Sequence, residues 1–310
     1  MKLEELLLKG WGIKDQIVKT EVGLNKSTWK VGNLYWLSSY PKEALNRLVN
    51  ECHLYTLLEE FFENDGIELS IPSTIKTLDN KQYYSEGDFL FRVSKHVNGI
   101  KPDVKDQGLY QVLAEGLGKL HLALKRVPVT SISSPISIVE DTKKNLILFR
   151  NSPKDMFNSY NEYHLLKSVG LIIEKHITQM TSLEVQAIHG DFSHPNLCVN
   201  QNSLVGVLDF EFYGVDPPIM DLATIGLTLI LRSDHLKHDE ILLIMIKTYN
   251  EITGSRIDLQ LLVAAMFMRK YDSYCYHKDQ YLSGNGSSDV LKRQINQLNT
   301  LLKKYNKSSL

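Results

Sequence analysis

The spacing of apolar residues changes along the chain from a strand-like to a helix-like period. Short apolar runs in the first third predict strands at 17–21, 27–31, 34–37 and 89–93. Helices are predicted there over 1–10 and 43–62. Apolar residues later recur every three or four positions and predict helices at 108–124, from Ser152 toward Met180, and at 239–252, 259–281 and 289–305. The pattern therefore describes a strand-rich first third followed by a mostly helical remainder.

A hairpin interrupts the helical part. Two apolar runs, 197–199 and 204–208, flank the turn residues Gln201-Asn202-Ser203. Asp191 and Asn196 precede the first strand, and Asp209 follows the second. Two carboxylates and a carboxamide are hard oxygen ligands for Mg²⁺, and a carboxylate can accept a proton from an attacking hydroxyl. The hairpin thus predicts a magnesium-nucleotide site, although an Asp-rich loop that only turns the chain and caps a helix gives the same residues.

Composition excludes several classes of partner. The 310 residues include 35 Lys and Arg against 36 Asp and Glu, a formal net charge of −1, so no strong field attracts nucleic acid or an anionic membrane. The longest uncharged apolar run, 222–231, is too short to cross a bilayer. Three widely spaced cysteines without a CxxC motif indicate reduced thiols. We expect a cytoplasmic monomer or homodimer that binds neither nucleic acid nor membrane.

Four spaced motifs resemble the aminoglycoside phosphotransferase and choline kinase-like group. They are His189-Gly190-Asp191 with Asn196, Leu208-Asp209-Phe210-Glu211, Asp216-Pro217, and Asp221-Leu222-Ala223. The resemblance implies an α+β, two-lobed, protein-kinase-like fold: a nucleotide-binding lobe, residues 1–95, with an antiparallel sheet and one helix, and a larger, mainly helical lobe, residues 96–310, that carries the catalytic hairpin and binds the acceptor. It also implies Mg²⁺ and ATP as cofactors, with GTP not excluded.

The same resemblance assigns roles to individual residues. It implies Asp191 as catalytic base, Asn196 and Asp209 as metal ligands, and His189 and Asp221 as structural support. For the nucleotide it implies Gly23, Asn25 and Ser27 in a phosphate loop, Ser38 and Glu51 near the phosphates, and Lys95 and Val97 at a hinge that reads adenine through its backbone. An ordinary hairpin turn at Gly23 and a solvated helix glutamate at 51 are equally open readings.

One position departs from the pattern. A kinase places a lysine near the end of its third strand to hold the phosphates, and here Ser38 occupies that place. The implied activity is transfer of the γ-phosphoryl of a nucleoside triphosphate to a hydroxyl of a small molecule: an aminoglycoside-type antibiotic, an amino alcohol or a homoserine-like acceptor. The serine supports the alternative, a catalytically inactive binding or scaffold protein that retains the kinase fold.

Overall fold

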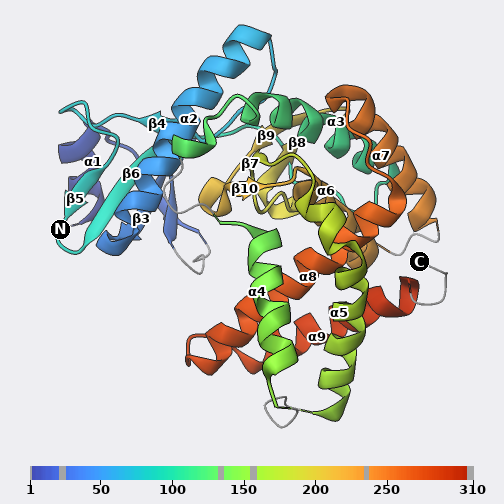
Figure 1. Ribbon diagram of the computed structural model, residues 1–310. Coiled ribbons are helices and arrows are strands. Elements are labelled where there is room, and N and C mark those ends of the chain that lie inside the picture. The colour runs from blue at the N-terminus through green and yellow to red at the C-terminus, as the bar shows by residue number, and fades with distance from the viewer. Residues whose placement is uncertain (1, 21–25, 132–135, 154–158, 234–236, 306–310) are drawn as a thin grey trace. The chain divides into compact units, whose positions relative to one another are not determined.

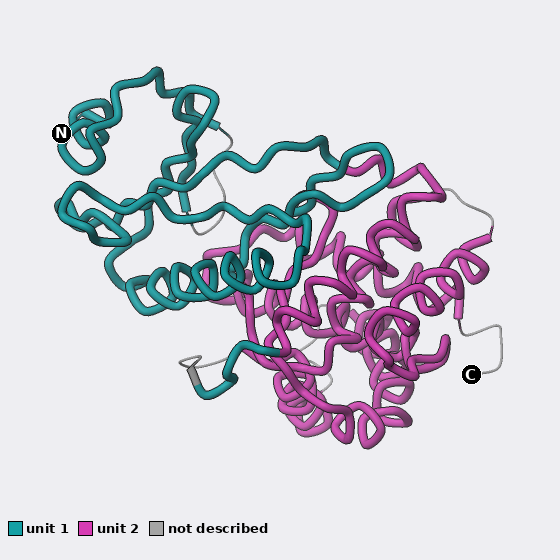
Figure 2. Tube along the Cα trace, turned by 90° about the horizontal axis from the view of Figure 1, so that it is seen from above, with its two compact units in different colours: residues 1–101, 126–134, 196–211 teal, residues 102–125, 135–195, 212–310 magenta. Residues whose placement is uncertain are grey.

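The computed structural model describes residues 2–20, 26–131, 136–153, 159–233 and 237–305. The chain forms two compact units, coloured separately in Figure 2. Unit 1 contains residues 1–101, 126–134 and 196–211, and unit 2 contains residues 102–125, 135–195 and 212–310. The predicted boundary between residues 95 and 96 stays a prediction.

Unit 1 is built on an antiparallel sheet. Its described strands are β1 (Ile17–Lys19), β2 (Ser27–Val31), β3 (Tyr35–Pro41), β4 (Thr74–Ile75), β5 (Tyr84–Glu86) and β6 (Phe89–Lys95). They follow the order β1-β2-β3-β6-β4, and β5 also pairs with β6. In this register Ser38 on β3 stands opposite Thr28 on β2 and Arg92 on β6. The position that lacks the kinase lysine is therefore flanked by the two neighbouring strands.

Two helices of unit 1 contribute to two separate apolar clusters with residues of the sheet. Helix α1 (Leu3–Trp11) is amphipathic and packs its buried Leu7 and Trp11 against Val31, Leu37 and Val93 of the sheet. Helix α2 (Leu45–Asp65) places Leu48 and Cys52 in a second cluster with Tyr40 and Leu90. Alternate residues of β3 and β6 thus enter different clusters, as the period of two requires.

The predicted hairpin is present and belongs to unit 1. Strands β8 (Leu197–Val199) and β9 (Leu204–Val207) pair antiparallel. Ile100 and Val199 exchange two backbone hydrogen bonds, of 2.9 and 2.8 Å. A Cβ at Gly206 would lie 2.2 Å from Cγ1 of Val97, so only glycine allows the hairpin to approach the segment after β6 this closely.

Unit 2 is mainly helical. Its described helices are α3 (Gln107–Leu124), α4 (Ile138–Asn151), α5 (Tyr160–Thr181), α6 (Ile219–Arg232), α7 (His238–Thr253), α8 (Leu259–Leu282) and α9 (Ser288–Tyr305). Helix α8 is buried along most of its first half and packs against α4, α5, α6 and α9 (Figure 1). Helix α3 packs on α7. In the part of the chain that is described, no helix is long and apolar enough to span a membrane.

The helix predicted from Ser152 toward Met180 is wrong in its start. Ser152 is the C-cap of α4, and α5 begins after Ser159, whose side chain accepts the N–H of Glu162. A serine followed by proline fits the region after a helix as well as the one before it.

Strands β7 (Gln186–Ile188) and β10 (Gly214–Asp216), which pair antiparallel, were not predicted either, because three residues are too few to show a period.

Candidate active site

Unit 1 contains a cavity of about 320 Å³ between its sheet and the hairpin. Six of the residues predicted to bind nucleotide or metal line it: Ser38, Glu51, Lys95, Val97, Asn196 and Asp209. Ser27 begins β2 opposite Ser39 and does not line the cavity. Gly23 and Asn25 lie outside the described residues. The structure therefore gathers six predicted site residues, far apart in sequence, around one cavity.

The cavity has an apolar end near the predicted hinge. Trp36, Pro72, Val97, Cys198 and Leu208 contribute to its lining there. In the described part of the chain, the N–H and C=O of Val97 make no hydrogen bond, so both are available to the edge of a base. The N–H of Lys95, by contrast, donates to the carbonyl of Ser73 at 2.9 Å.

Glu51 is paired at the buried end of the cavity. Its side chain is 1% exposed, which excludes the reading as a solvated helix residue. Arg92 Nη1 lies 3.3 Å from Glu51 Oε1, and the hydroxyl of Tyr55 donates to the same oxygen at 2.6 Å. Burial raises the pKa of Glu51, but the charges of Arg92 and Lys26 outweigh this effect and keep the pKa below its usual range. The carboxylate thus has a cationic partner, supplied by β6 rather than by β3.

A second cation enters the cavity from the residue before β2. Lys26 Nζ donates to Asp209 Oδ1 at 2.6 Å and lies 4.0 Å from Glu211 Oε2. The Lys26 side chain is only 13% exposed. Burial by itself would lower its pKa, but Tyr40 and the carboxylates of Glu51 and Asp209 raise the pKa above its usual range. A charged amine is therefore held beside one of the two predicted metal ligands.

Asp209 and Asn196 face the cavity from the two ends of the hairpin. The N–H of Leu208 donates to the carbonyl of Asn196 at 2.7 Å, which ties the two ends together. Asp209 has φ 60°, a left-handed conformation that aspartate tolerates better than most residues. Its carboxylate has a second oxygen besides the one bound to Lys26, and Asn196 adds an amide oxygen. This donor set fits a hard divalent cation such as Mg²⁺.

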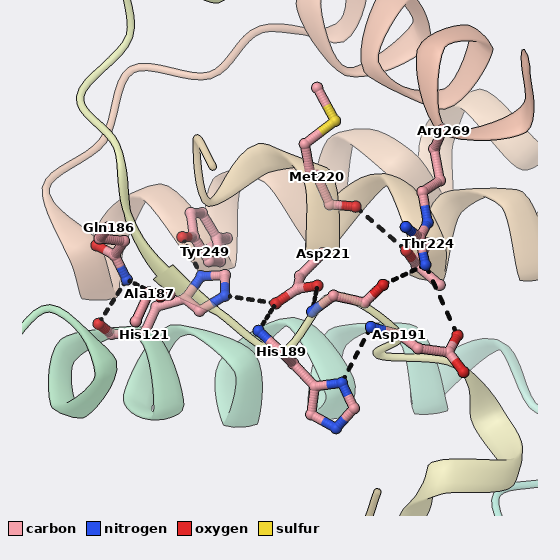
Figure 3. A network of polar contacts seen from close by, with 11 residues as sticks. His121, Gln186, Ala187, His189, Asp191, Met220, Asp221, Thr224, Tyr249 and Arg269 are labelled. Carbon is pink, nitrogen blue, oxygen red and sulfur yellow. Dashed lines mark hydrogen bonds and ion pairs between the residues drawn. The ribbon is translucent and has the colours of Figure 1, made fainter. Parts of the chain in front are cut away.

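Asp191 belongs to unit 2, in the loop that follows β7 (Figure 3). Asp221, in the first turn of α6, accepts the N–H groups of His189 at 2.7 Å and Gly190 at 2.9 Å. His121 Nε2 lies 3.1 Å from the same carboxylate. Burial raises the pKa of Asp221, but the hydrogen bond and charge of His121, with His189, outweigh it and keep the pKa below its usual range. The loop is therefore anchored to a buried carboxylate at the start of a helix.

The side chain of His189 makes a hydrogen bond within the same loop. Its buried ring accepts the N–H of Asp191 on Nδ1 at 3.1 Å. Both residues predicted to support the site thus contact the loop around Asp191, while their effect on catalysis stays a prediction.

Gly190 makes the tight path of this loop possible. It has φ +80°, and a Cβ would lie 1.9 Å from the carbonyl oxygen of Phe212. We expect Gly190→Ala to lower the thermal midpoint more than Gly254→Ala. Gly254 has φ +72° with nothing within 4 Å of its Cβ position. The control loses only the left-handed conformational freedom, about 1–2 kcal/mol, whereas Gly190→Ala also forces two backbone segments apart. Equal midpoints in scanning calorimetry would contradict this account.

Asp191 also faces a cavity of its own unit, of about 190 Å³. Its Oδ1 lies 3.9 Å from Nη2 of Arg269 on α8, and Arg269 donates to the carbonyl of Gly190 (Figure 3). The carboxylate is 34% exposed. It is therefore accessible to a small molecule and oriented by a loop with few degrees of freedom.

Comparison with known proteins assigns the chain to a family. The model of the phosphotransferase enzyme family matches residues 23–236. The chain belongs to the phosphotransferase enzyme family. This family membership confirms that the protein is a small-molecule kinase, which the motifs in its sequence predicted. A search among curated proteins found no significant match.

Solved structures show the same fold as this phosphotransferase. The GDP and kanamycin complex of APH(2")-IIIa matches with a TM-score of 0.70 and 17% identity, covering 98% of this chain and 100% of the other. Amicoumacin kinase hAmiN with AMP-PNP, Ca²⁺ and Ami gives a TM-score of 0.71 and 15% identity over 98% and 92% of the two chains. Macrolide 2'-phosphotransferase MphH from Brachybacterium faecium gives 0.66 and 13% over 96% of each. The predicted kinase-like fold is confirmed.

Sequence reasoning missed two residues of this phosphotransferase, Lys26 and Arg92. Arg92 interrupts the apolar run of β6, and a charge within a buried strand signals a buried partner. Lys26 carries no comparable signal, because its contact with Asp209 spans 183 positions in the sequence.

Proposed function

We propose that this kinase transfers the γ-phosphoryl of ATP, or of GTP, to a hydroxyl of a small molecule with the help of Mg²⁺. The observation that carries the proposal is the cavity of unit 1, in which Asn196 and Asp209 present oxygen ligands beside the ammonium of Lys26. Such a group binds a metal-bound triphosphate. Complexes of related folds with GDP, AMP-PNP or ADP support a nucleotide as phosphoryl donor.

The base enters at the apolar end of the cavity. In this proposal the N–H and C=O of Val97, which make no hydrogen bond among the described residues, pair with its edge, and Trp36, Cys198 and Leu208 cover its faces. Because the N–H of Lys95 is already bound, Lys95 has only its carbonyl to offer. Recognition by one backbone N–H and one backbone C=O does not by itself distinguish adenine from guanine. The proposal therefore includes both ATP and GTP as substrates.

The phosphates lie at the polar end. Lys26 binds phosphate oxygens, and Arg92 stays with Glu51 and fixes the floor of the cavity. The buried Nε of Arg92 has no hydrogen-bond acceptor among the described residues. Mg²⁺ held by Asn196 and Asp209 would offset the negative charge of the phosphates.

Asp191 acts on the acceptor. It orients the hydroxyl and accepts its proton as the new oxygen–phosphorus bond forms and the bond from the γ-phosphorus to the bridging oxygen breaks, releasing the nucleoside diphosphate. Asp191 precedes Asn196 by five residues, so their Cα atoms are at most about 18 Å apart. The chain thus sets an upper limit to the distance between the base and Asn196. Hydrogen bonds from backbone N–H groups of the loop to Asp221 and His189 restrict the loop and reduce the entropy lost in positioning.

Nucleotide binding tests the proposal directly. We expect calorimetry to detect binding of MgATP or MgGTP that weakens when EDTA removes the metal. Asp209→Asn should raise the Mg²⁺ concentration needed for half-maximal binding about tenfold, because one charged ligand becomes neutral. Asp88→Asn, an exposed change in the turn before β6 of the same unit, is the matched control. Absence of nucleotide binding by the wild-type protein would refute the proposal.

The inactive scaffold was supported by Ser38 alone. Lys26 and Arg92 weaken that support, since two cations line the same cavity as Ser38. Nucleotide binding without stimulated diphosphate release on any hydroxyl acceptor would favour the scaffold instead.

A further inference from the structure

The cavity at Asp191 is small and strongly basic. Its volume is about 190 Å³, below the roughly 300 Å³ at which pockets begin to hold drug-sized ligands. Three of its lining residues are cations, Arg232 at the end of α6 and Arg269 and Lys270 on α8, and its only lining carboxylate, among the residues described, is Asp191. The cavity and all of its lining residues belong to unit 2.

Two of the three basic side chains of this cavity, Lys270 and Arg232, have no carboxylate partner among the described residues. Lys270 is 6% exposed, and its ammonium binds the amide oxygens of Gln294 and Gln297 rather than a carboxylate. Arg232 is exposed and has no ion pair with any residue that the structure describes. Burial lowers the pKa of Lys270 to about 7, and repulsion from Arg293, Arg269 and Arg232 adds to the effect. Like charges are therefore crowded here when Lys270 is protonated, and a bound anion would favour its protonated form.

The carboxylates that a polycationic acceptor needs lie elsewhere. Asp239 lies 3.9 Å from Lys304, and Asp258 caps α8 by accepting the N–H of Leu261. Asp216 is bound to Ser137 and to the start of α4. Asp272 influences Arg269 electrostatically but does not line the cavity. Among the described residues, the lining of this cavity thus has more basic than acidic groups, unlike a pocket for a polycationic acceptor.

We propose that the acceptor of this kinase is a small hydroxyl compound that carries an anionic group, a carboxylate or a phosphate, a few bonds from the reacting hydroxyl. The inference rests on the proposed function, in which Asp191 receives the hydroxyl proton. Arg269 Nη2 lies 3.9 Å from Asp191 Oδ1, so a hydroxyl on the aspartate brings its neighbouring anion to the arginine. Arg232 and Lys270 then bind the remaining anionic oxygens.

Matched acceptors that share a hydroxyl and differ in charge test this proposal. Diphosphate release with MgATP is measured for glycerate, homoserine and glycerol 3-phosphate against glycerol, choline and kanamycin. We expect kcat/KM for the best anionic acceptor to exceed that for glycerol at least tenfold. Glycerate and glycerol 3-phosphate distinguish a carboxylate from a phosphate as the anion. Preference for choline, kanamycin or glycerol would overturn the proposal.

Arg232 supplies the variant test, because it lies at a helix end outside the core. Arg232→Gln should raise KM for the preferred anionic acceptor about tenfold and leave KM for glycerol within threefold. Lys247→Gln removes an exposed charge on α7, outside this cavity, and should change neither. An unchanged KM in Arg232→Gln would count against the proposal, since Arg232 would then serve only the helix end.

Binding experiments separate this inference from the proposed function. The three compounds that carry a carboxylate or a phosphate (glycerate, glycerol 3-phosphate and the zwitterion homoserine) are titrated by calorimetry into the wild-type protein saturated with Mg and AMP-PNP. If none of them binds while the nucleotide does, the anionic acceptor is wrong and the kinase proposal stands. If the nucleotide itself does not bind, the proposed function fails first.

Discussion

Replacing Asp191 with asparagine should lower kcat about a thousandfold while the protein stays folded and still binds MgATP. A positioned general base contributes between a hundredfold and ten-thousandfold to the rate. Asparagine keeps the size of the side chain but cannot accept the hydroxyl proton. The N–H groups of residues 189–191 and their partners Asp221 and His189 are unaffected. Single-turnover and steady-state assays with the best acceptor of the panel measure the effect.

The Asp191 variant needs a control for folding and for charge. Asp289→Asn removes a carboxylate that is 88% exposed on α9 and should leave kcat unchanged. The thermal midpoints of both variants should lie close to that of the wild type, because Asp191 is itself one-third exposed. An Asp191→Asn variant that keeps near-normal turnover would exclude this residue as the base. Loss of activity with a collapsed midpoint would show that the residue serves the fold instead.

The residues around Asp191 could be predicted because the amino-acid types that form the motif lie close together in the sequence. His189, Asp191 and Asn196 lie within eight positions, and Asp221 begins the next helix. Three hydrogen bonds of this loop are local or reach the start of α6, and a fourth comes from Arg269 on α8. Long helices such as α8 could be predicted because their apolar period extends over many turns. Local patterns therefore found the loop around Asp191 and most of the helices.

The electrostatics of both cavities could not be predicted, because they depend on contacts between distant segments. Lys26 and Asp209 are 183 positions apart in the sequence. Asp191, in the loop after β7, likewise lies near Arg269 on α8. Ser38 raised doubt about activity because it stands where a kinase places its lysine, whereas the cations that line the same cavity, Lys26 and Arg92, come from other segments. Strands β7 and β10 were missed for a different reason, since three residues carry no period.

Lys26→Met should lower kcat/KM for MgATP about a hundredfold, because a preorganised charge on the phosphates is lost. Removal of one such contact typically costs ~3 kcal/mol of transition-state stabilisation. Methionine keeps the apolar stem that packs in the cavity, so the fold should be preserved. Lys19→Met, an exposed change on the neighbouring strand β1, is the matched control and should have no effect. Nucleotide affinity from calorimetry and turnover from diphosphate release together show which step suffers.

A double variant then tests whether the lysine has moved rather than disappeared. The β2–β3 register places Ser38 beside Thr28, and both line the cavity that Lys26 enters. Lys26→Ser combined with Ser38→Lys should therefore recover at least tenfold of the activity that Lys26→Ser loses, because an ammonium returns to the same phosphates from β3. Glu51 keeps Arg92 as its partner in either case, so the new lysine is free for the nucleotide. Full activity of Lys26→Met would instead assign the phosphates to Arg92 alone.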